Sequence, residues 1–166
     1  MYEEFAFQAA VVYNVQIMIK KAKIGDITKI HKLVNHFAGQ DKMLARSLSE
    51  LYENLRDFLV YEEKGRIYGC VALHMFWEDL AEIKCLAVWE SGQKKGIGSR
   101  LLKGALKEAK KIGIKKVFAL TYEAGFFEKY GFGKVDKSEL PHKIWSECIK
   151  CPKFPNCDET AMTITF

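Results

Sequence analysis

The sequence predicts one layered α/β domain, in which helices flank a mixed, mostly antiparallel central sheet. Three observations support this prediction: the length of 166 residues, a meander of apolar strands over residues 58–89, and alternating helices and strands after residue 97. A chain of this length can bury a core without disulfides or metal. The hydrophobic share of 49% and the charged share of 28% are typical of soluble globular proteins, and no apolar run approaches the roughly 18 residues of a membrane span.

Residues 1–17 are set apart as an N-terminal extension: an additional strand, an arm or a leader. Glu3 and Glu4 lie where an export signal requires positive charge. We therefore expect no export signal and a cytoplasmic protein. Residues 18–166 form the predicted domain, within which residues 141–158 stand out as a cysteine-rich segment.

The domain begins with a predicted strand over residues 17–22 and continues with two helices. Apolar residues at helical spacing predict the first helix: Ile27, Ile30, Val34 and Phe37. Ser47 and Glu50 form a capping-box pattern, which predicts the start of the second helix and places Arg46 just outside its N-terminus. The apolar stripe of that helix is expected to be Leu48, Leu51, Leu55 and Phe58.

The remaining elements follow from residue type and breaks in the pattern. β-Branched, aromatic and aliphatic residues predict the three antiparallel strands 58–62, 66–77 and 80–89. A glycine-rich turn is then followed by a long helix to about residue 111, a strand at 116–121, a short helix ended by Gly131, and a last strand at 161–166.

The turn Gln93–Gly98 has the properties of an anion site. Backbone N–H groups at a helix start are unpaired and lie at the positive end of the helix dipole. Gly96 and Gly98 allow a phosphate to approach the backbone, and Lys94 and Lys95 add positive charge. The turn matches neither a P-loop nor the dinucleotide fingerprint. The alternative is a helix that merely starts after a flexible turn.

The spacing Gln93-x-x-Gly96-x-Gly98 resembles the Q/R-x-x-G-x-G/A motif of the GCN5-related N-acetyltransferases (GNAT), and the order of elements from Met18 onward is similar too. Within that superfamily, "AEIKCLAVWE", "GQKKGIGSRLL" and "VFALTYEAGFFEKYGF" look like the catalytic domain of N-acetylglutamate synthase, in the short stand-alone form of arginine biosynthesis. The resemblance implies the GNAT fold, with an acetyl-CoA cleft between splayed central strands.

The resemblance also implies the residues that bind acetyl-CoA. The glycine turn would hold the pyrophosphate, and the backbone at the end of the preceding strand would pair with the pantetheine arm and stabilise the oxyanion. The implied cofactor-binding residues are Leu86, Ala87, Val88, Gln93, Lys94, Lys95, Gly96, Ile97, Gly98 and Ser99.

The family's chemistry is direct attack of an amine on the thioester. Period-two alternation in the strand 80–89 predicts that Glu82, Lys84, Leu86 and Val88 share one face. Glu82 lies at the acidic position of the synthase motif, which implies a general base. The alternative is a surface carboxylate paired with Lys84.

The acid that protonates the leaving thiolate is less defined. Many family members carry a tyrosine where this chain has Phe127. Thr121 is the first substitute and Tyr122 the second, and a thiol with a pKa near 8.5 needs little help from an acid.

Arg46 and Lys84 are the candidates for binding substrate carboxylates, since arginine makes a two-pronged contact with a carboxylate. The alternative for Arg46 is an ordinary surface arginine. The predicted function is acetylation of the α-amino group of L-glutamate. Acetylation of a protein N-terminus, a lysine or a polyamine remains open, as does a CoA-binding sensor without turnover.

The five cysteines, an odd number, indicate reduced thiols. Four residues of the C-terminal segment could form a zinc site but are equally consistent with free thiols or a redox pair, so no metal is predicted: His142, Cys148, Cys151 and Cys157. The net charge of +5 is spread out. We expect small-molecule partners, an amino acid and acetyl-CoA, with no nucleic acid and no membrane; a homodimer is an open alternative to a monomer.

Overall fold

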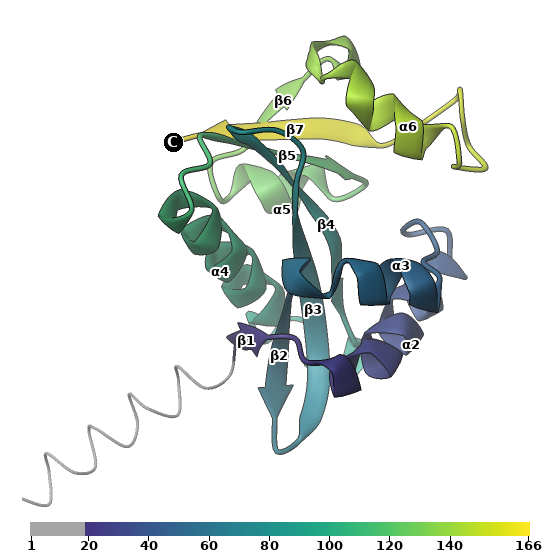
Figure 1. Cartoon of the computed structure of the whole chain (residues 1–166), viewed down its shortest axis with the longest axis vertical. Coiled ribbons are helices and arrows are strands. Elements are labelled where there is room, and N and C mark those ends of the chain that lie inside the picture. Colours follow the sequence, from purple (N-terminus) through teal and green to yellow (C-terminus); the bar gives the residue numbers. More distant parts are fainter. Residues whose placement is uncertain (1–18) are drawn as a thin grey trace, which may run out of the picture.

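The computed structural model describes residues 19–166, so the predictions for residues 1–17 lie outside the described part of the chain. Seven strands form one sheet in the order β1-β2-β3-β4-β5-β7-β6, with helices on both faces (Figure 1). Among the described strands, β4 and β5 are the parallel pair and the other neighbours are antiparallel. The predicted mixed, mostly antiparallel sheet is confirmed.

The strands are β1 (Ile19–Lys21), β2 (Phe58–Glu63), β3 (Arg66–Met75), β4 (Leu80–Val88), β5 (Lys116–Thr121), β6 (Gly133–Val135) and β7 (Thr160–Thr165). The α-helices are α2 (Ile27–Ala38), α3 (Leu48–Glu53), α4 (Ile97–Lys111), α5 (Ala124–Glu128) and α6 (Trp145–Cys148). Short 3-10 turns are η1 (Ile24–Asp26), η2 (Leu55–Asp57), η3 (Glu90–Gly92), η4 (Lys137–Glu139) and η5 (His142–Ile144).

Helices α4 and α5 cover one face of the sheet, and α2 and α3 cover the other (Figure 1). On the first face Leu101 and Leu102 of α4 pack against strand residues such as Ile83. On the second face Ile30 and Val34 of α2 are fully buried. A third apolar cluster packs the C-terminal segment onto the sheet: Phe76, Leu80, Phe118, Leu140, Ile144 and Ala161.

The meander, the long helix and the strand that follows it are confirmed within one or two residues. The second helix is shorter than predicted, because α3 ends at Glu53 and η2 follows. Its expected apolar stripe is therefore wrong: Leu51 is buried, Leu48 is 41% exposed, and Phe58 belongs to β2. Strand β6 and helix α6 were not predicted from the sequence.

A β-bulge interrupts β4. Ala72 of β3 pairs with Lys84, whereas Cys70 pairs with Ala87, so β4 carries one additional residue between these pairs. Cys85 accommodates it with a φ of 53°.

The bulge reverses the alternation of side chains along β4. Leu86 and Val88 pack against the α4 cluster, together with Ile83, whereas Lys84 and Glu82 face the other side of the sheet. The prediction that Leu86 and Val88 share a face with Glu82 and Lys84 is therefore wrong. Simple period-two counting fails here because an inserted residue shifts the pattern by one.

Strands β4 and β5 pair only at their beginnings. Their register in the described chain runs from Leu80 opposite Lys116 to Glu82 opposite Phe118 and ends there. Strand β5 continues to Thr121 with β7 as its partner, while β4 continues with β3. The two central strands therefore diverge beyond Glu82, which confirms the predicted splay of the central strands.

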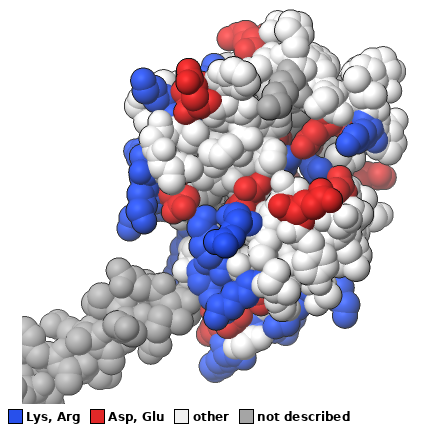
Figure 2. Space-filling view, viewed as in Figure 1, with Lys and Arg blue, Asp and Glu red and all other residues white. Residues whose placement is uncertain are grey.

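Charge is interspersed on the surface of the face drawn in Figure 2, where basic and acidic side chains lie close to one another. None of the helices within residues 19–166 has the length and apolar character needed to cross a membrane.

Gly69 provides a test of the packing beside the bulge. A Cβ at this position would lie 2.9 Å from the carbonyl oxygen of Ala87 and 2.9 Å from Cδ1 of Leu101. We predict that Gly69→Ala lowers the free energy of unfolding by about 1–3 kcal/mol, as overpacking commonly does. Urea denaturation measures this, with Gly25→Ala as control because a Cβ there meets nothing within 4 Å. Equal stability of both variants would contradict the described approach of β3 and β4.

Candidate active site

A cavity of about 490 Å³ opens on the α2 and α3 side of the sheet. Residues from both diverging strands line it, including Glu82 and Lys84 of β4 and Leu120 of β5. The loop before α3 supplies Arg46, and residues 137–159 supply the opposite wall. The cavity therefore lies beside the separation between β4 and β5, where polar side chains stand between two apolar clusters.

Glu82 is a buried carboxyl group, with 8% of the residue exposed. Burial raises the pKa of Glu82 to about 7, because loss of water disfavours the charged form. The positive charge of Lys84 acts in the opposite direction, the charge of Glu147 raises the pKa further, and Arg46 and His74 lower it. A carboxyl group poised near neutral pH can accept a proton from an amine and release it again.

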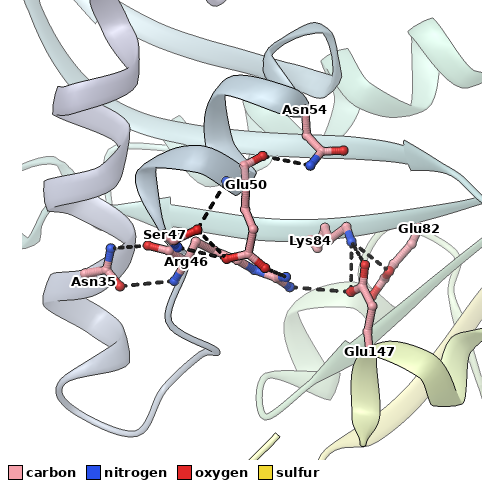
Figure 3. A network of polar contacts seen from close by, with 8 residues as sticks. All are labelled: Asn35, Arg46, Ser47, Glu50, Asn54, Glu82, Lys84 and Glu147. Carbon is pink, nitrogen blue, oxygen red and sulfur yellow. Dashed lines mark hydrogen bonds and ion pairs between the residues drawn. The ribbon is translucent and has the colours of Figure 1, made fainter. Parts of the chain in front are cut away.

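Lys84 and Arg46 meet at Glu147, which extends from α6 (Figure 3). Lys84 Nζ donates to both carboxylate oxygens of Glu147, at 2.8 and 3.0 Å. Glu147 Oε2 lies 3.7 Å from Arg46 Nη2, and Lys84 Nζ lies 3.7 Å from Glu82 Oε2. Partial burial acts to raise the pKa of Glu147, but Lys84 and Arg46 outweigh it and leave that pKa lowered.

The backbone of Arg46 is held by α2. The side chain of Asn35 donates to the carbonyl oxygen of Arg46 at 2.8 Å and accepts from its N–H at 3.1 Å. The predicted capping box follows at once: Ser47 Oγ accepts from the N–H of Glu50, and the Glu50 carboxylate accepts from the N–H of Ser47. These contacts fix the point at which the arginine side chain enters the cavity (Figure 3).

The glycine turn lies at the start of α4, as the sequence predicted. Lys94 and Gly96 both have positive φ, 60° and 76°, so the chain reverses sharply before the first helical residue. The Gln93 side chain donates to the carbonyl oxygen of Val88 at 3.0 Å, which ties the turn to the end of β4. Ser99 is hydrogen-bonded to the hydroxyl of Tyr130. The N–H groups of the first helical turn have no acceptors within their own helix.

Thr121 is the last residue of β5 and Tyr122 follows it, and the two differ in environment. Thr121 Oγ1 accepts from the N–H of Glu123 at 2.8 Å, which leaves its own proton available. Tyr122 is 40% exposed and lines the cavity, where its hydroxyl donates to Asp158 and accepts from Lys153. Partial burial raises the pKa of Tyr122.

All five cysteines are free thiols. Cys148, Cys151 and Cys157 line the outer wall of the cavity, but no group of three or more metal-ligating side chains occurs in the part of the chain that the structure describes. Burial raises the pKa of the Cys148 thiol.

The structure thus brings Arg46, Glu82, Lys84 and Tyr122 to one cavity, whereas Thr121 and the glycine turn do not line it. Two residues of the site, Glu147 and Asn35, were not predicted from the sequence. Glu147 stands 63 residues from Lys84 in a segment without periodicity, so no local pattern could connect them.

Known proteins that resemble this chain identify its family. The model of the acetyltransferase (GNAT) family matches residues 26–132. The chain belongs to the GNAT family. The protein is thus an N-acetyltransferase.

Similar proteins extend this result. The chain is 39% identical over 147 residues to an uncharacterized N-acetyltransferase of Chlorobaculum tepidum, covering 89% of this chain and 95% of the relative. It is 32% identical over 136 residues to an amino-acid acetyltransferase of Mycobacterium tuberculosis, covering 80% and 78%. A crystal structure of N-acetylglutamate synthase from Neisseria gonorrhoeae, complexed with coenzyme A and N-acetyl-glutamate, superposes with a TM-score of 0.81 at 32% identity, over 89% of this chain and 34% of that one.

The burial of Glu82 can be tested directly. We predict that its carboxyl carbon titrates with a midpoint near pH 7 in the folded protein, because burial raises its pKa to about 7. Carbon-13 NMR of glutamate-labelled protein measures the midpoint, and Glu82→Gln identifies the resonance by its loss. Titration complete below pH 5 would contradict the buried environment.

Proposed function

We propose that this N-acetyltransferase transfers the acetyl group of acetyl-CoA to the α-amino group of L-glutamate. One observation carries the proposal: a buried carboxyl group, Glu82, shares a cavity beside the β4–β5 separation with two cationic side chains, Arg46 and Lys84. Glutamate has an amine that Glu82 can deprotonate and two carboxylates that Arg46 and Lys84 can bind.

In the proposed reaction, the amine nitrogen attacks the thioester carbon, forming the C–N bond. Glu82, ionised above its pKa, accepts the proton that the amine loses. The backbone of residues 86–88 stabilises the oxyanion. The C–S bond then breaks, and the thiolate takes a proton from solvent or from Thr121, whose hydroxyl proton is not used in its bond to Glu123.

The donor is acetyl-CoA, and its pyrophosphate is assigned to the turn at Gln93–Ser99. Lys94 and Gly96 with positive φ form a tight turn, and the first N–H groups of α4 have no acceptor within their own helix, an arrangement that favours bound phosphate. Gln93 fixes this turn to β4.

The names of similar proteins support glutamate as the acceptor. Several relatives carry the name amino-acid acetyltransferase, and the Neisseria gonorrhoeae synthase structure contains N-acetyl-glutamate. The proposal accordingly places the enzyme in arginine biosynthesis and in the cytoplasm.

The acceptor assignment is tested by thiol release from acetyl-CoA with each of the twenty amino acids, spermidine and a lysine peptide. Glutamate is expected to give the highest kcat/KM. If glutamate is inert at millimolar concentration while spermidine or the peptide is acetylated, the acceptor assignment is wrong.

For the cofactor site, we predict that Gly98→Val weakens CoA binding roughly tenfold or more, because the branched side chain covers backbone amides that bind phosphate with charge-assisted hydrogen bonds. A Cβ at Gly98 has only ordinary contacts, 3.8 Å to Phe126 and Val88, so folding should persist. Calorimetric titration with CoA measures the affinity, and Gly125→Val is the control because a Cβ there meets nothing within 4 Å. If Gly98→Val melts like the wild-type protein and binds CoA with unchanged affinity, the turn does not bind the cofactor.

For the acceptor, we predict that Arg46→Ala raises the KM for glutamate roughly tenfold to a hundredfold and leaves the KM for acetyl-CoA nearly unchanged. The reason is the loss of one charge-assisted contact to a carboxylate. Steady-state kinetics measure both constants, with the exposed Arg56→Ala as control. An equal rise of both KM values would indicate general damage in place of a lost substrate contact.

A further inference from the structure

A carboxylate of the chain itself, that of Glu147, binds Lys84 and Arg46, the two cations assigned to the acceptor. Glu147 carries the same functional group as the side chain of free glutamate, and Figure 3 shows it pointing from α6 toward Lys84 and Arg46. Lys84 Nζ donates to both of its oxygens, at 2.8 and 3.0 Å, and Arg46 Nη2 lies 3.7 Å from one of them.

With Glu147 in place, the positive charges of Lys84 and Arg46 are balanced by neighbouring carboxylates. Arg46 also has Glu50 at 4.0 Å, and Lys84 has Glu82 at 3.7 Å. Another carboxylate entering this arrangement would meet three acidic side chains, Glu50, Glu82 and Glu147, beside the two cations. Arg46 nevertheless has unused donor capacity, since its buried Nε has no hydrogen-bond partner among the described residues.

The exposure of the three side chains argues against a purely structural bridge. Glu147 is 34% exposed, whereas Lys84 and Arg46 are 13% and 15% exposed. An ion pair with a partly exposed partner contributes little to stability. Two neighbouring, poorly hydrated cations, however, are costly without an anion beside them. Glu147 supplies that anion when no acceptor is bound.

The element that carries Glu147 is small. Helix α6 has four residues, and the stretch from residue 149 to residue 159 contains neither helix nor strand. Ile144 and Cys148 anchor the segment to the third apolar cluster, while the adjacent Ile149 is 65% exposed. Withdrawal of the Glu147 side chain from the two cations requires no change in the pairing of β4 with β3, because Glu147 lies on α6 and not on the sheet.

We infer that Glu147 and the carboxylate of the acceptor are alternative ligands of Lys84 and Arg46, which makes Glu147 a determinant of acceptor specificity. The inference rests on the proposed function, since it requires an acceptor that bears a carboxylate. Such an acceptor replaces Glu147 on the two cations. A simple amine leaves Glu147 in place and gains nothing from them.

The test compares Glu147→Gln with wild-type enzyme. Removing the competing charge should lower the KM for glutamate about three- to tenfold with little change in kcat or in the KM for acetyl-CoA, because apparent affinity scales with the fraction of sites that are open. Glutarate is a dicarboxylate without an amine. As a competitive inhibitor, it should have an inhibition constant that falls by the same factor. Glu128→Gln, which removes an exposed carboxylate paired with Lys134, is the matched control and should change nothing.

Melting curves establish that each variant is folded, and Glu147→Asp, with a shorter reach to Lys84, should lie between wild type and Glu147→Gln. If wild-type enzyme acetylates glutamate and Glu147→Gln leaves the KM and the glutarate inhibition constant unchanged or higher, the inference is overturned and the proposed function stands. If neither enzyme acetylates glutamate while both acetylate spermidine, the proposed function fails and the inference fails with it.

Discussion

The bulge in β4 determines how the parts of the site are arranged. One additional residue, accommodated by the positive φ of Cys85, turns the side chains after it to the opposite face of the sheet. The same strand therefore presents Glu82 and Lys84 to the cavity and packs Leu86 and Val88 against α4. Before the bulge, at Glu82, the pairing of β4 with β5 ends, and the central strands separate where an acyl donor can enter.

The separation of the strands creates an electrostatic problem that the fold has to solve. A carboxyl group and two cations lie poorly hydrated between apolar clusters, and each would be unfavourable alone. Glu82 responds with a raised pKa, and Lys84 and Arg46 share Glu147. The charged groups of the site thus compensate one another. A ligand that displaces one of them has to make the contacts that this group made.

Local patterns in the sequence predicted most of the elements, because hydrophobic spacing, the capping box at Ser47 and the glycines before α4 act within a few residues. Alternation along the strand also placed Glu82 and Lys84 on one face, whereas Arg46 became a candidate through its residue type and its position before a helix. The reversal at Cys85 was not predictable, because a bulge depends on the partner strand and leaves no composition signal. Glu147 and Asn35 were missed for a related reason: their partners are distant in the chain, 63 residues away for Lys84 and 11 for Arg46.

Strand β7 lies between β5 and β6, although it comes last among the elements described. It pairs with every residue of β5 from Lys116 to Thr121 and with β6 from Gly133 to Val135. During synthesis, the segment that carries Glu147 and the cavity cysteines therefore leaves the ribosome before the strand against which it will pack. Until residues 160–165 emerge, β5 presents an open edge to other chains, and the outer wall of the cavity lacks Ala161, the β7 residue of the apolar cluster on which it packs.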